Sequence, residues 1–140
     1  MSTQSVAPPS PGADEVFFLP LGGTGEIGMN LNLFGHAGQW LMVDCGITFE
    51  REGAASRIEL PDPRFIVANR ERLAGIIITH AHEDHLGALS LLWPQLQAPV
   101  YATPFAAEVL RRKAAGRGGT LPERIHRCHP GSHLTLGPFS

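Results

Sequence analysis

Three isoleucines at residues 76–78 lead into the segment His-Ala-His-Glu-Asp-His at residues 80–85, and a second apolar run follows at residues 86–93. A buried strand that passes into a polar loop and then into a helix has this pattern. Side chains on such a loop lie together at one end of a sheet. This segment therefore predicts a strand–loop–helix unit that carries the chemically active side chains.

The polar loop contains histidine and carboxylate side chains, the ligands that suit Zn²⁺ or a similar divalent ion. His80, His82 and Asp84 share one face in extended backbone, because side chains at alternate positions point the same way. His85 lies at the predicted helix start and can turn toward them, whereas Glu83 has the opposite parity and is expected outside the ligand set. Two donors followed by a different pair indicate two adjacent metals, which can generate hydroxide at neutral pH. This spacing favours a metal site over a solvated loop that is merely rich in histidine.

Asp44 ends another apolar segment and is followed by Cys45 and Gly46. A carboxylate at this point either caps a turn or accepts the second N–H of a metal-bound histidine, which fixes the orientation of the ring. We favour the second role for Asp44.

Two other patterns resemble sites but are interpreted differently. Residues 23–28 match G-x-G-x-x-G after an apolar segment, yet residues 30–33 look like a strand, whereas a dinucleotide site requires a helix N-terminus there. We expect a tight glycine turn beside the active site, with backbone N–H groups near an anionic substrate. A second cluster is interrupted by Pro130 and Gly131 and has no standard zinc spacing, so a solvated turn is expected for its members, His126, Cys128, His129 and His133.

The length of 140 residues provides for one domain with a packed core, and the formal net charge of −2 carries no signature of nucleic-acid binding. Basic residues gather between residues 111 and 127, where a solvated helix face is favoured over a phosphate-binding patch. Cys45 and Cys128 are too few for a disulfide framework and are expected to be reduced. The sequence has no signal-peptide pattern and no membrane-spanning stretch, so a cytoplasmic location is expected.

The chain divides into a tail at residues 1–13, which is rich in Ser, Pro and Gly and expected to be disordered, and a domain at residues 14–140. Strands are predicted at residues 15–21, 29–34 and 40–44 as an antiparallel meander, then at 74–79 and 99–102, with weaker strands at 125–127 and 133–136. Helices are predicted at residues 62–72, 84–96 and 104–115, and a long polar loop at 46–61. Strands followed by alternating strand and helix indicate an α/β layered fold.

Taken together, these motifs resemble a known family. Residues 80–85 are similar to the H-x-H-x-D-H signature of the metallo-β-lactamase fold. The glycine turn with Asn30, the Asp44-Cys45-Gly46 segment, Leu-Pro-Asp at residues 60–62 and residues 79–88 resemble the N-terminal part of the ribonuclease J family, the bacterial β-CASP group of RNA-processing nucleases. Pro-Val-Tyr-Ala-Thr-Pro at residues 99–104 and Leu-Gly-Pro-Phe at 136–139 continue the resemblance, which covers nearly everything from Val16 onward.

The resemblance implies an αββα sandwich with two zinc ions, of which this chain is the N-terminal half. It assigns His80 and His82 to the first metal, Asp84 and His85 to the second, and a supporting role to Asp44; Asp84 and His85 are also the expected catalytic residues. The implied reaction is hydrolysis of RNA phosphodiesters, both endonucleolytic and 5′-to-3′ exonucleolytic, in RNA processing and decay. A homo-oligomeric full-length protein without membrane contact is expected.

The third histidine motif of that family would follow the position of Ser140, so the chain is expected to be truncated before the remaining ligands and inactive as a fragment. The sequence leaves two alternatives open. One is another hydrolase of the metallo-β-lactamase fold, of the thioesterase or lactonase type. The other is a non-catalytic folding or interaction module.

Overall fold

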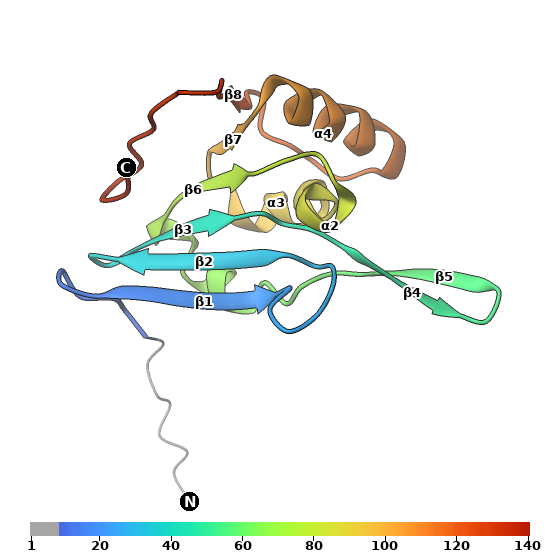
Figure 1. Ribbon diagram of the computed structural model, residues 1–140, viewed down its shortest axis with the longest axis horizontal. Helices are drawn as coiled ribbons and strands as arrows, with labels where there is room; N and C mark the ends of the chain where they lie inside the picture. The colour runs from blue at the N-terminus through green and yellow to red at the C-terminus, as the bar shows by residue number, and fades with distance from the viewer. Residues whose placement is uncertain (1–8) are drawn as a thin grey trace, which may run out of the picture.

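The computed structural model describes residues 9–140 and shows a mixed six-stranded sheet, helices packed against it, and a separate two-stranded hairpin (Figure 1). The sheet begins with the predicted antiparallel meander, formed by β1 (Val16–Gly22), β2 (Leu31–His36) and β3 (Gln39–Val43). Three further strands extend the sheet in parallel beyond β3, namely β6 (Leu73–Ile78), β7 (Val100–Ala102) and β8 (His126–Arg127).

Helices occupy the crossovers between the parallel strands, which cannot be joined by a tight turn. Before β6 the chain forms α1 (Arg64–Ala68) and a 3₁₀ turn, η1 (Arg70–Arg72). Before β7 it forms α2 (Glu83–Leu86) and α3 (Leu89–Leu96), and before β8 it forms α4 (Pro104–Arg117). This alternation of strand and helix confirms the predicted α/β class.

The core lies between one face of the sheet and the helices. Alternate residues of the central strands point into it because side chains alternate between the two faces of a strand, and the register pairs Leu33 with Met42 and Met42 with Ile76. Trp40 also lies in this layer, with its ring edge-on to that of Phe65 in α1 at a centroid distance of 5.2 Å. Apolar residues of α1, α3 and α4 complete the same buried cluster, among them Ile66, Leu89, Leu92, Ala106 and Leu110.

The opposite face of the sheet is apolar but only partly covered. Phe18 packs beside Phe34 with the rings tilted and their centroids 5.3 Å apart, and 54% of the Phe18 surface remains exposed. The C-terminal segment crosses part of this face and leaves a hollow of about 270 Å³, whose lining includes Leu41, Ile77 and Phe139. This face is the side on which a second sheet layer would pack.

The prediction of a long polar loop at residues 46–61 is wrong. The segment contains a β-hairpin, β4 (Thr48–Glu52) and β5 (Ala55–Glu59), that extends away from the sheet (Figure 1). Phe49 and Ile58 are cross-strand partners, and Gly53 adopts φ +62° in the turn. Only two apolar residues face each other among many charged ones, so the hydrophobic alternation that reveals a strand is weak here.

The helix predicted at residues 84–96 is interrupted after α2. The N–H of Ala88 donates to the carbonyl of Cys45 rather than to an intrahelical partner, which redirects the chain before α3. Pro94 lies inside α3 and cannot donate to the Ser90 carbonyl, and that carbonyl accepts the N–H of Thr120 instead. Both departures depend on backbone groups far away in the sequence.

Two smaller predictions differ from the structure as well. The helix predicted at residues 62–72 divides into α1 and η1, and Asp62 accepts the N–H of Arg64 although Pro63 is the residue at the helix start. No strand forms at residues 133–136, where only a bridge between Leu136 and Phe139 occurs. A short apolar run beside the sheet therefore was not sufficient to add a strand.

The predicted disordered tail, residues 1–13, falls outside the described residues up to residue 8. Within its remainder, the carbonyls of Pro11 and Gly12 accept the N–H groups of Gly38 and Ala37 in the β2–β3 turn. Among the described residues, none of the helices combines the length and the apolar character needed to cross a bilayer.

Candidate metal centre

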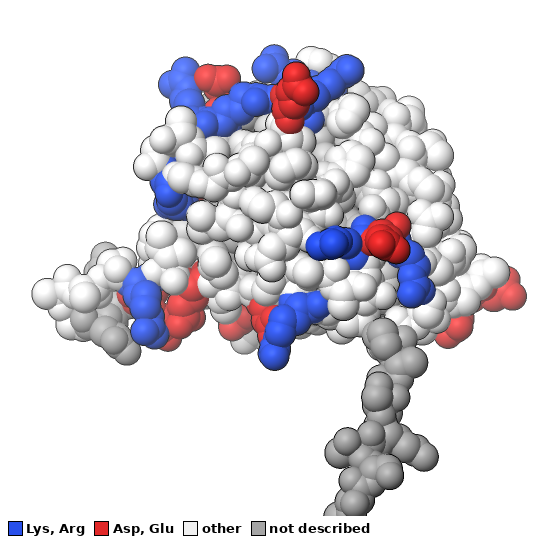
Figure 2. Space-filling model, turned by 180° about the vertical axis from the view of Figure 1, so that it is seen from behind, with Lys and Arg blue, Asp and Glu red and all other residues white. Residues whose placement is uncertain are grey.

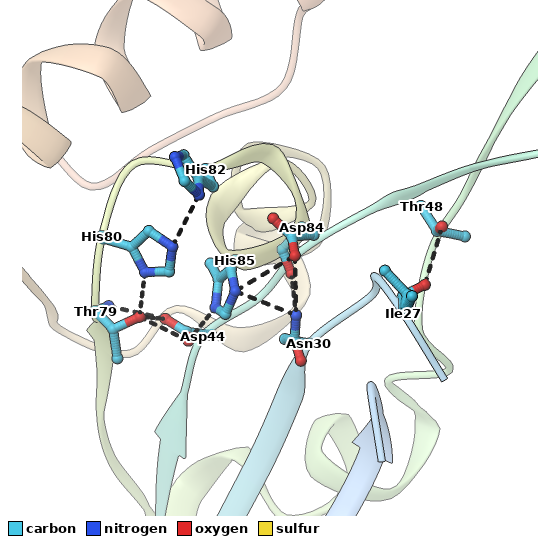
Figure 3. A network of polar contacts seen from close by, with 9 residues as sticks. All are labelled: Ile27, Asn30, Asp44, Thr48, Thr79, His80, His82, Asp84 and His85. Atoms are coloured by element: carbon cyan, nitrogen blue, oxygen red, sulfur yellow. Dashed lines mark hydrogen bonds and ion pairs between the residues drawn. The ribbon is translucent and has the colours of Figure 1, made fainter. Parts of the chain in front are cut away.

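The predicted site residues come together at the carboxyl ends of β3 and β6, which are adjacent parallel strands (Figure 3). Asp44 follows β3, and Thr79 and His80 follow β6. The N–H of Asp44 donates to the carbonyl of Ile77 at 2.8 Å, which holds the two strand ends together. Residues separated by more than thirty positions in the sequence thus line one edge of the sheet.

The helix α2 carries Asp84 and His85 and is held by the segment that follows β3. Three of its four carbonyls, those of Glu83, Asp84 and His85, accept the N–H groups of Ile47, Asn30 and Cys45, and Asn30 contributes from the residue before β2. Gly46 lies against this junction, and a Cβ atom there would be 1.7 Å from the Asp84 carbonyl oxygen. The close approach requires glycine at position 46.

Asp44 organises the polar network of the site. Its carboxylate is almost fully buried and accepts the backbone N–H and the hydroxyl of Thr79, each at 2.8 Å, and the Nδ1 of His85 at 2.7 Å. The Thr79 hydroxyl in turn contacts Nδ1 of His80 at 3.0 Å. Since Thr79 donates its proton to Asp44, its oxygen accepts from His80, and both rings then present Nε2 away from Asp44.

Four side chains form two adjacent pairs of possible ligand atoms. Nε2 of His80 lies 3.2 Å from Nδ1 of His82, and Nε2 of His85 lies 3.4 Å from Oδ2 of Asp84. Two ligands of a tetrahedral zinc ion, each about 2.0–2.1 Å from the metal, lie about 3.3 Å from each other. The spacing within each pair therefore fits a shared metal ion. The rings of His80 and His85 are 4.1 Å apart, so the pairs are neighbours.

Neither pair is a complete metal shell. Between residues 9 and 140, no group of three or more His, Cys, Asp or Glu side chains is arranged to hold a single ion. A closed zinc site has four ligands, and a catalytic one has three from the protein.

Asn30 is a site residue that sequence reasoning did not assign a role. Its side-chain amide donates to the Asp84 carbonyl at 3.0 Å and lies 3.4 Å from both Oδ2 of Asp84 and Nε2 of His85. It thus touches both members of the second ligand pair. The available signals were its position between the glycine turn and β2 and its place among the residues that carry the family resemblance.

The glycine turn lies beside the site, as predicted, and β2 follows it instead of a helix. Gly23, Gly25 and Gly28 adopt positive φ values of 78–97°, which explains their occurrence. A hollow of about 280 Å³ between this turn and α2 is lined by residues that include Ile27, Phe49 and Asp84. The absence of a helix after the glycines agrees with the rejection of a dinucleotide site.

The second histidine cluster does not converge. His126 stacks on Tyr101 with ring centroids 4.7 Å apart, and His129 is in a turn in which its N–H donates to the Ser132 hydroxyl. The exposed turn at His129 agrees with the prediction, whereas His126 lies in β8, where the prediction of a solvated turn is wrong.

The basic run is more structured than predicted. Figure 2 shows basic side chains along the top of the molecule, mixed with acidic ones, where Figure 1 places α4. Arg112 pairs with Glu108, but Lys113 and Arg117 reach Glu83 at the start of α2. Burial raises the pKa of the Glu83 carboxyl, and hydrogen bonds and charge from Lys113 and Arg117 outweigh that effect, so its pKa is lowered overall. The interpretation as a solvated helix face is therefore wrong for these two residues.

The protein has a mixed α/β sheet with helices on one face and a histidine–carboxylate loop at the carboxyl edge of the sheet. The chain belongs to the metallo-β-lactamase superfamily, whose sequence profile matches residues 28–134. Membership in this superfamily implies metal ions and confirms the predicted fold as a partial metallo-β-lactamase domain.

Curated relatives narrow the resemblance. The chain is 49% identical over 132 residues to ribonuclease J of Sinorhizobium meliloti, a match that covers 91% of this chain and 23% of that protein. Ribonuclease J 1 of Streptococcus pyogenes is 32% identical over 128 residues, with 91% and 23% covered, and ribonuclease J of Helicobacter pylori is 41% identical over 95 residues, with 67% and 14% covered. The resemblance to the N-terminal part of ribonuclease J is confirmed. The chain spans less than a quarter of the length of these relatives.

Proposed function

We propose that this chain supplies part of the metal centre of a ribonuclease that hydrolyses RNA phosphodiesters. The observation that carries the proposal is the pair of ligand-atom spacings, 3.2 and 3.4 Å, with both pairs linked to Asp44. Curated relatives named ribonuclease J support RNA as the substrate. Endonucleolytic and 5′-to-3′ exonucleolytic cleavage in cytoplasmic RNA processing and decay, by a β-CASP enzyme that forms homo-oligomers, belongs to the same proposal.

In this proposal His80 and His82 hold one zinc ion, and Asp84 and His85 hold the second. Bound zinc would supply a hydroxide at neutral pH and neutralise charge that develops on the phosphoryl group. Asp44 keeps His85 in the tautomer with Nδ1 protonated, and Thr79 does the same for His80, so that each ring offers Nε2. Asn30 holds Asp84 and His85 in position from the opposite side. Asp84 and His85 are the proposed catalytic residues.

A chimaera tests the proposed activity. In this chimaera, residues 14–140 replace the matching segment of the Sinorhizobium meliloti ribonuclease J. The chimaera is expected to bind zinc and to degrade 5′-monophosphorylated RNA. His80→Ala in the chimaera is expected to reduce turnover by about 10³-fold or more, because a metal-activated nucleophile is lost. His133→Ala is the matched control and leaves turnover unchanged. An active chimaera that loses nothing with His80→Ala contradicts the assignment, and hydrolysis of thioesters in preference to RNA favours the alternative enzyme class.

We propose further that the chain alone binds metal weakly and turns over little RNA, because two ligands per ion cannot hold the ions in fixed geometry. Titration of the isolated chain with Zn²⁺ tests this directly. Stoichiometric binding of two zinc ions at nanomolar concentration contradicts it.

A further inference from the structure

The helix α2 contains only four residues, has no side-chain cap at its N-terminus and yet carries two of the four proposed ligands. A helix this short has no stability of its own, because nucleation costs more than a few hydrogen bonds return. Its position must therefore come from its surroundings. The backbone of residues 30–47 holds its carbonyls on one side, as described above.

On the other side, α2 is tied to α4 through the Glu83 carboxylate. Oε1 of Glu83 accepts from the ammonium group of Lys113, and Oε2 accepts from Nη1 of Arg117 at 3.1 Å. Arg117 also donates, at 3.3 Å, to the carbonyl of Gly87, which is the residue directly after α2. One cation therefore contacts both ends of this helix.

The surroundings make this cluster more than a surface ion pair. The three charged side chains are only 26–35% exposed, and Gly87 leaves the space that the carboxylate occupies, since a Cβ there would lie 2.4 Å from Oε2 of Glu83. Exposed pairs contribute little, but a partly buried network of one anion and two cations is less screened by water. The Glu108–Arg112 pair on α4 is the contrasting case, with both side chains more than half exposed.

We propose that Glu83, together with Lys113 and Arg117, is a positioning residue that fixes α2 against α4 and so sets where Asp84 and His85 present their ligand atoms. The inference rests on the proposed metal centre, which it deepens by naming what holds the second ligand pair. Glu83 touches neither substrate nor metal in this arrangement. Small displacements of supporting groups are sufficient to disturb a metal site, because ligand geometry must be held to within about 0.5 Å.

A first experiment needs no metal. Amide hydrogen exchange by NMR is compared between the unsubstituted chain, Glu83→Gln and the control Glu108→Gln. The N–H groups of Asn30, Cys45 and Ile47, which donate to α2 carbonyls, are expected to exchange roughly tenfold faster in Glu83→Gln as α2 loosens. They remain unchanged in Glu108→Gln. The N–H of Asp44, which donates to β6, is the internal reference for a fold that stays intact.

A second experiment uses the chimaera described above, which completes the ligand set, and measures Co²⁺ bound in place of zinc. Glu83→Gln is expected to raise the Co²⁺ dissociation constant by about tenfold, the lower end of the effect of losing an outer partner of a metal ligand, and to alter the visible d–d absorption. The exchanged pair Glu83→Lys with Lys113→Glu restores the affinity in part, because the anion then lies on α4 between two cations. Glu108→Gln leaves affinity and spectrum unchanged.

The outcomes separate the two proposals. If the unsubstituted chimaera binds Co²⁺ and its Glu83→Gln variant binds Co²⁺ equally well, the positioning role is overturned, even if amide exchange is faster in that variant. If the unsubstituted chimaera binds no Co²⁺ at all, the proposed metal centre fails, and the exchange experiment alone then decides whether Glu83 fixes α2.

Discussion

At the scale of single residues, Thr79 connects the two ligand pairs. Asp44 reaches His85 directly, but it reaches His80 only through the Thr79 hydroxyl, which donates to Asp44 and accepts from Nδ1 of His80. One buried carboxylate thereby governs the tautomers of rings in both pairs. Because Asp44 lies far from Thr79 and His85 in the sequence, no local sequence pattern reveals this connection.

Replacement of Thr79 tests this connection. Thr79→Val keeps the shape but removes the acceptor for Nδ1 of His80, so the ring is expected to shift toward the tautomer with Nε2 protonated. Thr79→Ser keeps the hydroxyl and is expected to keep the original tautomer. The ¹⁵N chemical shifts of the His80 ring distinguish the two forms. Identical shifts in the valine and serine variants would show that the hydroxyl does not orient His80.

Cys45 lies fully buried between Asp44 and Gly46, and its burial, followed by the charge of Asp44, raises the pKa of its thiol from 9.0 to about 12. The folded state therefore keeps this proton where the unfolded state loses it. Stability from this group is present below pH 9 and is lost as pH rises toward 12, at about 1.4 kcal/mol per pH unit.

The free energy of unfolding, measured in denaturant between pH 8 and pH 11, is expected to fall more steeply for the unsubstituted chain than for Cys45→Ala. Tyrosine and lysine ionise in both chains, so the difference between the two pH profiles reports the Cys45 thiol alone. Parallel pH profiles would refute the raised thiol pKa.

At the scale of elements, the strand–loop–helix unit of β6 and α2 was predicted well because its signals are local. The isoleucine run, the alternating ligands and the leucines of α3 all lie within one stretch of chain. The hairpin β4–β5 was missed because its pattern is weak. The break between α2 and α3 was missed because Cys45 and Asn30, distant in the sequence, compete for the backbone groups of the helix.

A matched pair of glycines tests how α2 is docked. Gly46→Ala places a methyl group against the Asp84 carbonyl and is expected to lower the free energy of unfolding by about 3 kcal/mol and to abolish metal binding. Gly116 lies in α4 with open space around it, so Gly116→Ala is expected to raise the free energy of unfolding by about 0.5–1 kcal/mol. Urea unfolding of both variants gives the two values. A tolerated Gly46→Ala would contradict the close approach.

At the scale of the whole molecule, the helices cover one face of the sheet, and the opposite face is only partly covered. Val16 and Phe18 are 75% and 54% exposed there, and hollows beside them are lined by apolar residues such as Leu41 and Phe139. Contiguous exposed apolar surface of this kind promotes association. The relatives, more than four times as long, have further chain beyond the matched segment.

The isolated chain is expected to self-associate through this face. Phe18→Ser is expected to lower the apparent mass at high concentration in analytical ultracentrifugation, because it removes the largest exposed ring from the sheet. Phe105→Ser is the control, since Phe105 is 73% exposed on α4 in the helical layer. Equal effects of the two substitutions would show that association does not depend on the open face.

The sequence by itself determined the α/β class, the meander and the position of the polar loop after β6, because periodicity and residue chemistry act over a few neighbouring positions; the metal-ligand roles and the supporting role of Asp44 stay predictions. The tertiary structure alone decided that Thr79 joins His80 to Asp44, that Asn30 contacts Asp84 and His85, and that Glu83 pairs with α4 rather than with solvent. These contacts depend on strand register and crossover packing. Both bring together residues whose separation along the chain leaves no local signal.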